Sequence, residues 1–129
     1  MARRYDILRQ HLEVLSIAYV VSISEDYRWL LIQNFKLPRG FSRRETDALL
    51  EMPPDYPYSP PAVGGSRLYL PPNLQFRGRR LRDFHQEVNP GWGNWGWFCY
   101  EDIYWDPHRD DLLRFLEMVR QDLTEPNTW

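Results

Sequence analysis

Apolar residues near the start of the chain recur at the spacing of an amphipathic helix. Within residues 4–16 they fall three or four positions apart, with arginine and glutamate between them. These apolar positions are Ile7 or Leu8, Leu12 and Leu15. Side chains at this spacing lie on one face of a helix, so we predict a short helix that packs on a core through that face.

Beyond Ile17 the pattern changes to short apolar runs, which are typical of strands. Residues 18–23 are rich in β-branched side chains, and residues 29–35 and about 46–52 form two further runs. Short polar or proline- and glycine-containing connections separate them. Residues 67–70 are predicted to add a fourth, short strand. Consecutive strands with short connections predict a four-stranded antiparallel meander behind the first helix.

The segment at residues 53–61, with the sequence PPDYPYSPP, holds five prolines in nine residues. Each proline lacks an N–H donor and restricts the residue before it, so the segment cannot be a helix or a central strand. A polyproline recognition segment is one common use of such a run. Here the run follows a predicted strand and alternates with tyrosines, which favours an ordered loop packed on the core.

Residues 75–93 follow no clear period, and residues 76–91 are the least regular part of the chain. They include a local basic cluster, which consists of Arg77, Arg79, Arg80 and Arg82. We expect an exposed excursion here, one that could be mobile. A docking surface for a protein partner accounts for the cluster better than a nucleic-acid site does.

A second helix is predicted to close the chain. Asp106 would be its N-cap and Pro107 its first helical residue, with Asp110 and Asp111 in the first turn, where the helix dipole favours negative charge. Pro126 would end it. One apolar stripe follows this entry, formed by Leu112, Phe115 or Leu116, Val119 and Leu123.

Composition narrows the class of protein. A length of 129 residues predicts one domain over residues 1–129, and a formal charge of −2 does not favour nucleic acid as a partner. The single cysteine excludes an internal disulfide framework and is typical of a reducing compartment. The first residues lack the apolar run of a signal peptide, and no segment has membrane-spanning length. We therefore expect a cytoplasmic protein without a membrane partner.

Several kinds of site are not supported by the residues. The three histidines, His11, His85 and His108, and Cys99 lack zinc-ligand spacing. The glycines at residues 64–65 lack the lysine of a phosphate-binding loop, and the partners of a serine–histidine–aspartate triad cannot be identified. We expect neither a metal nor a cofactor.

The segment of residues 94–107, NWGWFCYEDIYWDP, concentrates the candidate chemistry. It holds Cys99 and three tryptophans, Trp95, Trp97 and Trp105. We expect a loop with aromatic walls that presents one thiol. On composition alone a lone cysteine is more often a small buried hydrophobe, and tryptophans more often serve core packing than ligand binding.

The order of these motifs resembles that of ubiquitin-conjugating enzymes over about residues 4–126. The sequence LLEMPPDYPYSPP, at residues 49–61, resembles their strand and Tyr-Pro-x-x-Pro-Pro loop. The run Pro71-Pro72-Asn73-Leu74 is similar to their His-Pro-Asn-Ile segment, with proline in place of histidine. Cys99, the Trp-Asp-Pro run at residues 105–107 and the closing helix match their cysteine, Trp-x-Pro motif and following helix. The FKLPRGF connection and the segment from Trp95 also resemble bacterial proteins of this type.

The resemblance implies an α+β, UBC-like fold and a set of roles. Cys99 would be the nucleophile that accepts a ubiquitin-like protein from an activating enzyme as a thioester and passes it to an amine of a protein substrate. Asn73 would donate to the oxyanion, and His85 could replace the missing histidine. Asn89 and Asn94 are weaker alternatives to Asn73.

Partner contacts also follow from the resemblance. Arginines of the first helix, Arg3, Arg4 and Arg9, would dock the activating enzyme, although a solvated helix face is the simpler interpretation. Tyr56 and Tyr58 would contact a partner from the proline-rich loop. The resemblance further implies a setting beside genes for an activating enzyme and a ubiquitin-like protein, with anti-phage defence as the cellular role.

Three departures keep a second hypothesis open. The motif histidine is absent, 25 residues separate Asn73 from Cys99, and Glu101 and Asp102 would disfavour a thiolate if they lay near it. A UBC-like module without catalytic activity, which binds a ubiquitin-like protein or scaffolds its activating enzyme, is the alternative. Binding of nucleic acid by the basic segment is a third, weaker hypothesis.

Overall fold

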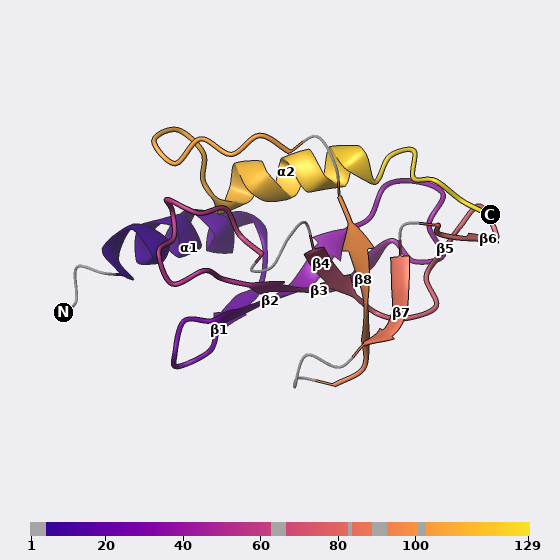
Figure 1. Ribbon diagram of the computed structural model, residues 1–129, viewed down its shortest axis with the longest axis horizontal. Coiled ribbons are helices and arrows are strands. Elements are labelled where there is room, and N and C mark those ends of the chain that lie inside the picture. The colour runs from indigo at the N-terminus through magenta and orange to yellow at the C-terminus, as the bar shows by residue number, and fades with distance from the viewer. Residues whose placement is uncertain (1–4, 63–66, 83, 89–92, 101–102) are drawn as a thin grey trace.

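Two helices lie on one face of an antiparallel sheet in the computed structural model of the chain (Figure 1). The structure describes residues 5–62, 67–82, 84–88, 93–100 and 103–129. Its helices are α1 (Asp6–Ala18) and α2 (Leu112–Asp122). Within the described residues, neither helix is both long and apolar enough to cross a membrane.

The sheet has six strands in the order β1-β2-β3-β4-β8-β7, and all its pairings are antiparallel. Their bounds are β1 (Val21–Ile23), β2 (Trp29–Lys36), β3 (Glu45–Glu51), β4 (Arg67–Leu70), β7 (Phe84–Val88) and β8 (Trp95–Cys99). A separate small hairpin joins β5 (Gln75–Phe76) to β6 (Arg79–Arg80). The predicted four-stranded meander is present as β1 to β4, and two further strands extend it.

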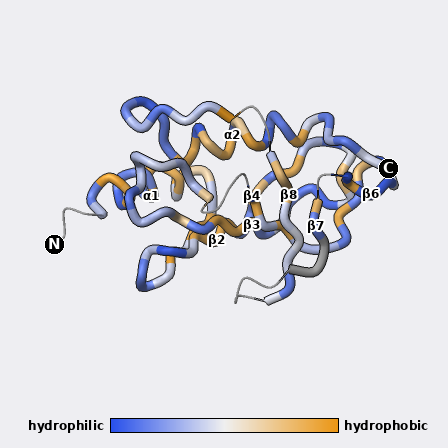
Figure 2. The backbone as a smooth tube through the Cα atoms, viewed as in Figure 1, coloured by the Kyte–Doolittle hydropathy of each residue, from blue (hydrophilic) through white to orange (hydrophobic). Residues whose placement is uncertain are grey.

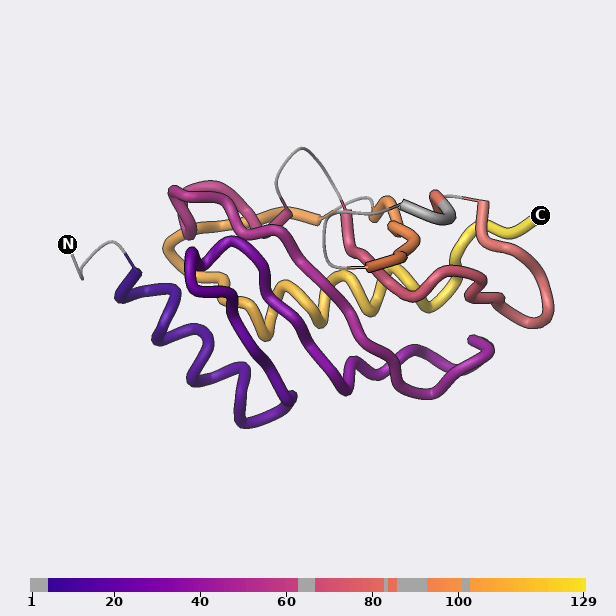
Figure 3. The backbone as a smooth tube through the Cα atoms, turned by 90° about the horizontal axis from the view of Figure 1, so that it is seen from below, coloured from indigo at the N-terminus to yellow at the C-terminus, as the bar shows by residue number. Residues whose placement is uncertain are grey.

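Strand alternation gives the sheet two different faces. The inner face packs against both helices and contributes Leu30, Ile32, Leu50, Leu68, Leu70 and Phe98 to the main core. The outer face carries a second, aromatic cluster built from Trp29, Leu31, Leu49, Tyr69, Trp95 and Trp97. Figure 2 shows hydrophobic positions concentrated along the central strands, and Figure 3 views the sheet from the side opposite the helices, with α2 behind it.

Both helices use the predicted apolar stripes, but α2 begins later than predicted. In α1, Leu8 rather than Ile7 is buried, together with Leu15. The N-cap of α2 is Asp111, whose side chain accepts a hydrogen bond of 2.8 Å from the Arg114 amide. The prediction of an Asp106 N-cap was therefore wrong.

Asp106 begins a separate turn, which explains why the sequence there resembles the start of a helix. Its carboxylate accepts from the His108 amide at 2.9 Å, and its carbonyl accepts from the Asp110 amide at 2.8 Å. Pro107 follows within this turn. An aspartate before a proline favours a helix entry and a tight turn for the same reason, since its carboxylate satisfies nearby amides. Only packing of the later apolar stripe decided where the helix starts.

The described part of the expected excursion, residues 75–82, 84–88 and 93, contains three short strands, β5, β6 and β7. β7 from this segment forms the edge of the main sheet beside β8, with Phe84 paired to Phe98. Phe84 is only 7% exposed and belongs to the main core. The polar sequence of β7 suits an edge strand, which explains why hydrophobic alternation did not reveal it.

The predicted aromatic loop at residues 94–107 is in part a strand. Trp95–Cys99 forms β8, which lies between β4 and β7. Gly96 is required there because a Cβ atom on it would overlap the ring of Phe84. Side chains of the short WGWFC sequence alternate between the two faces of the sheet, and the glycine occupies an inner position where the Phe84 ring leaves no room for a side chain.

The proline-rich loop at residues 53–61 is held against the core, as predicted. The Trp105 indole N–H donates to the Pro57 carbonyl at 2.6 Å, and the Tyr100 hydroxyl donates to the Pro61 carbonyl at 3.3 Å. The Tyr56 ring lies 5.6 Å from the Trp105 ring, centroid to centroid. These contacts join the loop to the segment that leads from β8 into α2.

Candidate functional site

Cys99 is the last residue of β8 and pairs with Arg67, the first residue of β4. Its neighbour Phe98 points into the main core, 4% exposed. Since successive side chains of a strand alternate between faces, Cys99 lies on the outer face with Trp95 and Trp97. Cys99 is partly exposed to solvent and is not buried in the core.

Among the described residues, three side chains have register positions near Cys99 on this face. The guanidinium carbon of Arg67 lies 3.4 Å from the centroid of the Trp97 ring, and the His85 ring meets the same indole edge-on at 4.8 Å. His85 pairs with Trp97, which places it diagonal to Cys99, at about 7–8 Å between Cα atoms. We call Arg67, His85, Trp97 and Cys99 the Cys99 surface.

The described part of the Cys99 surface has an aromatic floor and one guanidinium. Arg67 belongs to the strand neighbour of Cys99, and its guanidinium is held flat on the Trp97 indole. The Trp97 indole N–H is buried and has no hydrogen-bond partner among the described residues. Glu101 and Asp102, which would add negative charge, lie outside the described residues.

Asn73 lies at the opposite end of the sheet from Cys99. In the antiparallel pair β4–β8, Arg67 is level with Cys99 and Leu70 is level with Gly96. Leu70 is therefore about 10 Å from the level of Cys99, and the chain continues away from it to Asn73. Asn73 itself is exposed and has a positive φ of 68°. The structure does not bring the predicted oxyanion donor to the predicted nucleophile.

The alternative amide donors are no better placed. Asn94 is exposed and directly precedes β8, so the whole length of that strand separates it from Cys99. Asn89 lies outside the described residues. Of the predicted catalytic residues, the structure brings together only Cys99 and His85.

Of the described residues predicted to contact partners, some are exposed and one is buried. Tyr58 is 69% exposed, whereas Tyr56 is 5% exposed and not available to a partner. Arg9 is on the surface of α1 and donates to the Tyr27 hydroxyl at 3.0 Å. Arg3 and Arg4 lie outside the described residues.

Tyr56 has a structural role instead, in a buried polar pair. Its hydroxyl oxygen lies 2.6 Å from His11 Nδ1, where α1 meets the proline-rich loop. Burial raises the pKa of Tyr56 well above its usual range, and the charges of Asp111 and Asp110 raise it further. Burial lowers the pKa of His11, against a smaller opposing effect of Asp111. Both groups therefore remain neutral at neutral pH.

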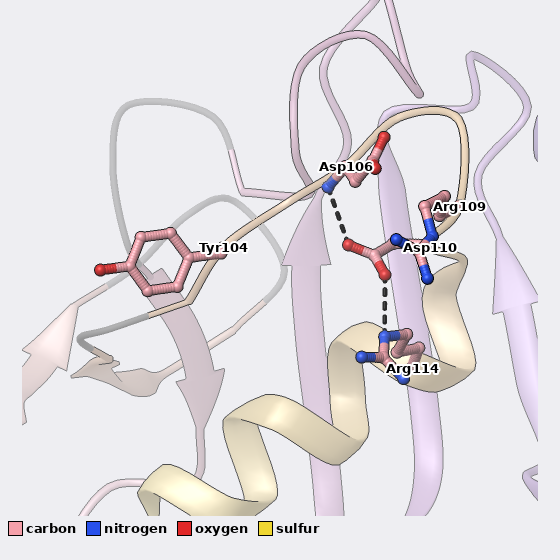
Figure 4. A pocket seen from close by; sticks show the side chains of 5 residues that line it. All are labelled: Tyr104, Asp106, Arg109, Asp110 and Arg114. Carbon is pink, nitrogen blue, oxygen red and sulfur yellow. Dashed lines mark hydrogen bonds and ion pairs between the residues drawn. The ribbon is translucent and has the colours of Figure 1, made fainter.

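A pocket of about 310 Å³ opens where the turn at Asp106 meets α2 (Figure 4). Asp110, only 8% exposed, dominates it: its carboxylate accepts from the Asp106 amide at 2.7 Å and forms an ion pair of 2.8 Å with Arg114. The carboxylate is thus occupied in holding the turn to the helix. Sequence analysis missed this role because it assigned Asp110 to the first turn of α2.

The described residues include no group of three or more histidine, cysteine, aspartate or glutamate side chains placed to hold a metal ion. A partly exposed thiol beside a guanidinium and an imidazole has the groups that nucleophilic acyl transfer requires.

Comparison with known families places the chain in a family of prokaryotic proteins. A family model described as "Prokaryotic E2 family E" matches residues 6–126, which covers both helices and every strand. No curated protein and no solved structure matches the chain.

Proposed function

The chain belongs to the prokaryotic E2 family E, and from this we propose that it carries a ubiquitin-like protein as a thioester on Cys99. Membership makes the chain ubiquitin-conjugating-like. One observation supports the finer assignment. The only thiol of the chain is partly exposed on the open face of the sheet, beside Arg67, and is not enclosed in the core.

The proposed reaction has two acyl transfers. The Cys99 thiolate attacks the carbonyl carbon of the thioester that joins the ubiquitin-like protein to its activating enzyme. A new C–S bond forms, the old one breaks, and the cysteine of the activating enzyme leaves as a thiolate, which takes up the proton that Cys99 released on ionisation. An amine of the protein substrate then attacks the Cys99 thioester, so that a C–N bond forms, the C–S bond breaks, and the amine proton returns to the thiolate.

Arg67 and His85 have distinct proposed roles on the Cys99 surface. A positive charge next to a thiol favours the thiolate, which is the reactive form. Arg67 supplies that charge on the strand next to Cys99. His85, on the other neighbouring strand, would accept the proton of the attacking amine and pass it to the departing Cys99 thiolate. We assign no oxyanion role to Asn73, because the register separates it from Cys99.

The surroundings of Cys99 would also hold the end of the ubiquitin-like protein. The stacked pair of Arg67 and Trp97 offers an apolar surface and a cation to an extended tail. An activating enzyme would dock elsewhere, on α1, where Arg9 is exposed. An activating enzyme, a ubiquitin-like protein and an amine-bearing substrate are thus the proposed partners.

A charging assay tests this proposal. The protein is incubated with its activating enzyme, ATP and the ubiquitin-like protein, and the products are separated on non-reducing gels. We expect an adduct that a thiol reagent removes and that Cys99→Ala abolishes. Asn73→Ala, a change at the far end of the sheet, is the matched control and should charge like the wild type. No adduct under conditions that charge the activating enzyme would refute the proposal.

A binding module without catalytic activity is the second candidate. The separation of Asn73 from Cys99 favours it, since no described asparagine is placed to stabilise an oxyanion at Cys99. This candidate predicts that the ubiquitin-like protein or the activating enzyme binds equally well to wild type and Cys99→Ala, with no adduct in either case. Pull-down experiments with both variants, run beside the charging assay, separate the two functions.

A further inference from the structure

A cavity of about 500 Å³ lies at the end of the sheet opposite Cys99. It is formed by the β2–β3 connection, residues 37–44, together with the last turn of α2. Its lining includes one carboxylate, Glu45, and five cations: Lys36, Arg39, Arg43, Arg44 and Arg120. Four positive charges are therefore in excess there, although the whole chain has a formal charge of −2.

In the part of the chain that the structure describes, no salt bridge joins any of the five cations of the cavity to a carboxylate. Arg120 donates to the Lys36 carbonyl at 3.0 Å, a bond that fixes its position and leaves its charge uncompensated. Uncompensated cations of this density repel one another, so an anion bound among them would stabilise the protein.

Backbone hydrogen bonds hold the connection in place without such an anion. The Leu37 amide donates to the Arg44 carbonyl at 2.9 Å, and the Arg77 amide donates to the Gly40 carbonyl at 2.7 Å. Phe41 packs edge-on against Phe76 at 5.2 Å between ring centroids. The arginines thus project from a fixed backbone, which lowers the entropic cost of ligand binding.

Other arginines at this end of the molecule lie outside the cavity lining, and three of them contact rings or the backbone of the protein. Arg77 lies over the Phe76 ring, and Arg82 lies over the Trp129 ring at 4.8 Å. Arg79 donates to the Trp129 carbonyl. Figure 1 shows β5 and β6 close to the chain terminus at this end. These three arginines are held at aromatic rings or at Trp129, whereas the five cations line one cavity.

We propose that this cavity binds the oligophosphate group of a small ligand. Guanidinium groups present forked pairs of N–H donors that match phosphate oxygens, and four of the five cations are arginines. The cavity volume lies in the range of small-molecule sites. Leu37 and Phe41 give it an apolar part beside the charged one. A concentrated cluster suits a compact anion better than an extended nucleic acid, which contacts a stripe of charges.

The test is calorimetric titration of the full chain with tripolyphosphate at low and at physiological ionic strength. We expect saturable one-to-one binding to the wild type. In the double variant Arg43→Gln, Arg44→Gln affinity should fall at least about tenfold, because a charge-assisted hydrogen bond contributes roughly one tenfold step. Arg80→Gln removes one arginine charge, against two in the double variant, from nearby β6 outside the cavity, and should change affinity by less than about twofold.

Several outcomes decide the matter. No saturable binding to the wild type, or an equal loss in Arg80→Gln, would overturn the proposal. Competition by ATP for the same site supports it, and affinity of ATP above that of tripolyphosphate indicates that a nucleoside also fits. Displacement of tripolyphosphate by single-stranded DNA at lower concentrations than by ATP would identify a nucleic-acid surface instead.

Two controls keep these outcomes interpretable. Circular dichroism melts of each variant show whether it is folded, and the substituted arginines are exposed. The proposal does not depend on Cys99, so a failed charging assay leaves the result of the titration unaffected.

Discussion

The chemical environment of Cys99 depends on single positions in two neighbouring strands. Arg67 is level with Cys99 in the register, and its guanidinium is fixed on the Trp97 ring. A slip of one residue would move Cys99 to the core side of the sheet, where Phe115 lies and where a buried thiol is inert. The reactivity proposed for Cys99 therefore depends on the register in which β8 pairs with β4.

Removal of the Arg67 charge should slow the reaction of the Cys99 thiol. In Arg67→Gln we expect alkylation by iodoacetamide at pH 7 to slow by roughly threefold, because an exposed charge pair is partly screened by solvent. Its pH profile should move to higher pH. Arg67→Lys keeps the charge and should restore most of the rate. If the lysine and glutamine variants react equally slowly, the role of Arg67 is packing on Trp97 and not charge.

At Tyr56 and Asp111, packing of the core decided a role that the local sequence left open. A tyrosine in a proline-rich loop is often exposed, but Tyr56 is buried against Trp105 and His11. Asp106 and Asp111 both precede residues with helical potential, and only Asp111 caps α2. The choice between equivalent local signals was made by which apolar side chains reach the core.

At the scale of elements, β7 and β8 are the main addition to the predicted meander. β8 lies next to β4, and β7 pairs with its other side and forms the edge of the sheet. Their sequences are short and interrupted by glycine and polar residues, so periodicity alone did not identify them. The contact between Gly96 and Phe84 fixes how closely the two strands approach.

Gly96→Ala should destabilise the protein by about 1–3 kcal/mol, the usual cost of overpacking a core. The added methyl group would overlap the Phe84 ring and lies 3.1 Å from the His85 carbonyl oxygen. Urea denaturation measures the change in the free energy of unfolding. The double variant with Phe84→Leu should lose less than the sum of the two single losses. Strictly additive losses would show that the overlap is not the cause.

At the scale of the whole molecule, the sheet separates two regions of different character. The Cys99 surface lies at the end of β8, level with the start of β4. The basic cavity and Asn73 lie at the other end, where β2 turns into β3 and β4 ends. Two ligands could thus occupy the molecule at once, a macromolecular one at Cys99 and a compact anion at the cavity.

The pair of His11 and Tyr56 should make overall stability depend on pH. Because burial lowers the pKa of His11 in the folded state, the unfolded chain binds the extra proton more readily. The free energy of unfolding should therefore be highest above pH 6.5, the ordinary value for histidine, and fall as pH decreases through the lower folded value. Thermal melts between pH 5 and pH 7.5 measure this effect.

His11→Gln is the comparison for that experiment. Glutamine keeps a polar partner for the Tyr56 hydroxyl but does not titrate, so its melting temperature should vary less over the same range. His108→Gln, a change at an exposed turn residue, should retain the wild-type dependence. An unchanged dependence in His11→Gln would assign the effect to other groups.

The local pattern determined the two helices, the first four strands, the packed proline-rich loop and the resemblance that the family match supports. These features depend on residues close together in the chain, where spacing and proline geometry act directly. Only the tertiary structure decided that Cys99 faces outward, that His85 lies near it, that Asn73 does not, and that five cations converge at the far end. Each of these depends on the pairing of distant strands, and pairing is set by the packing of the whole core rather than by any one segment.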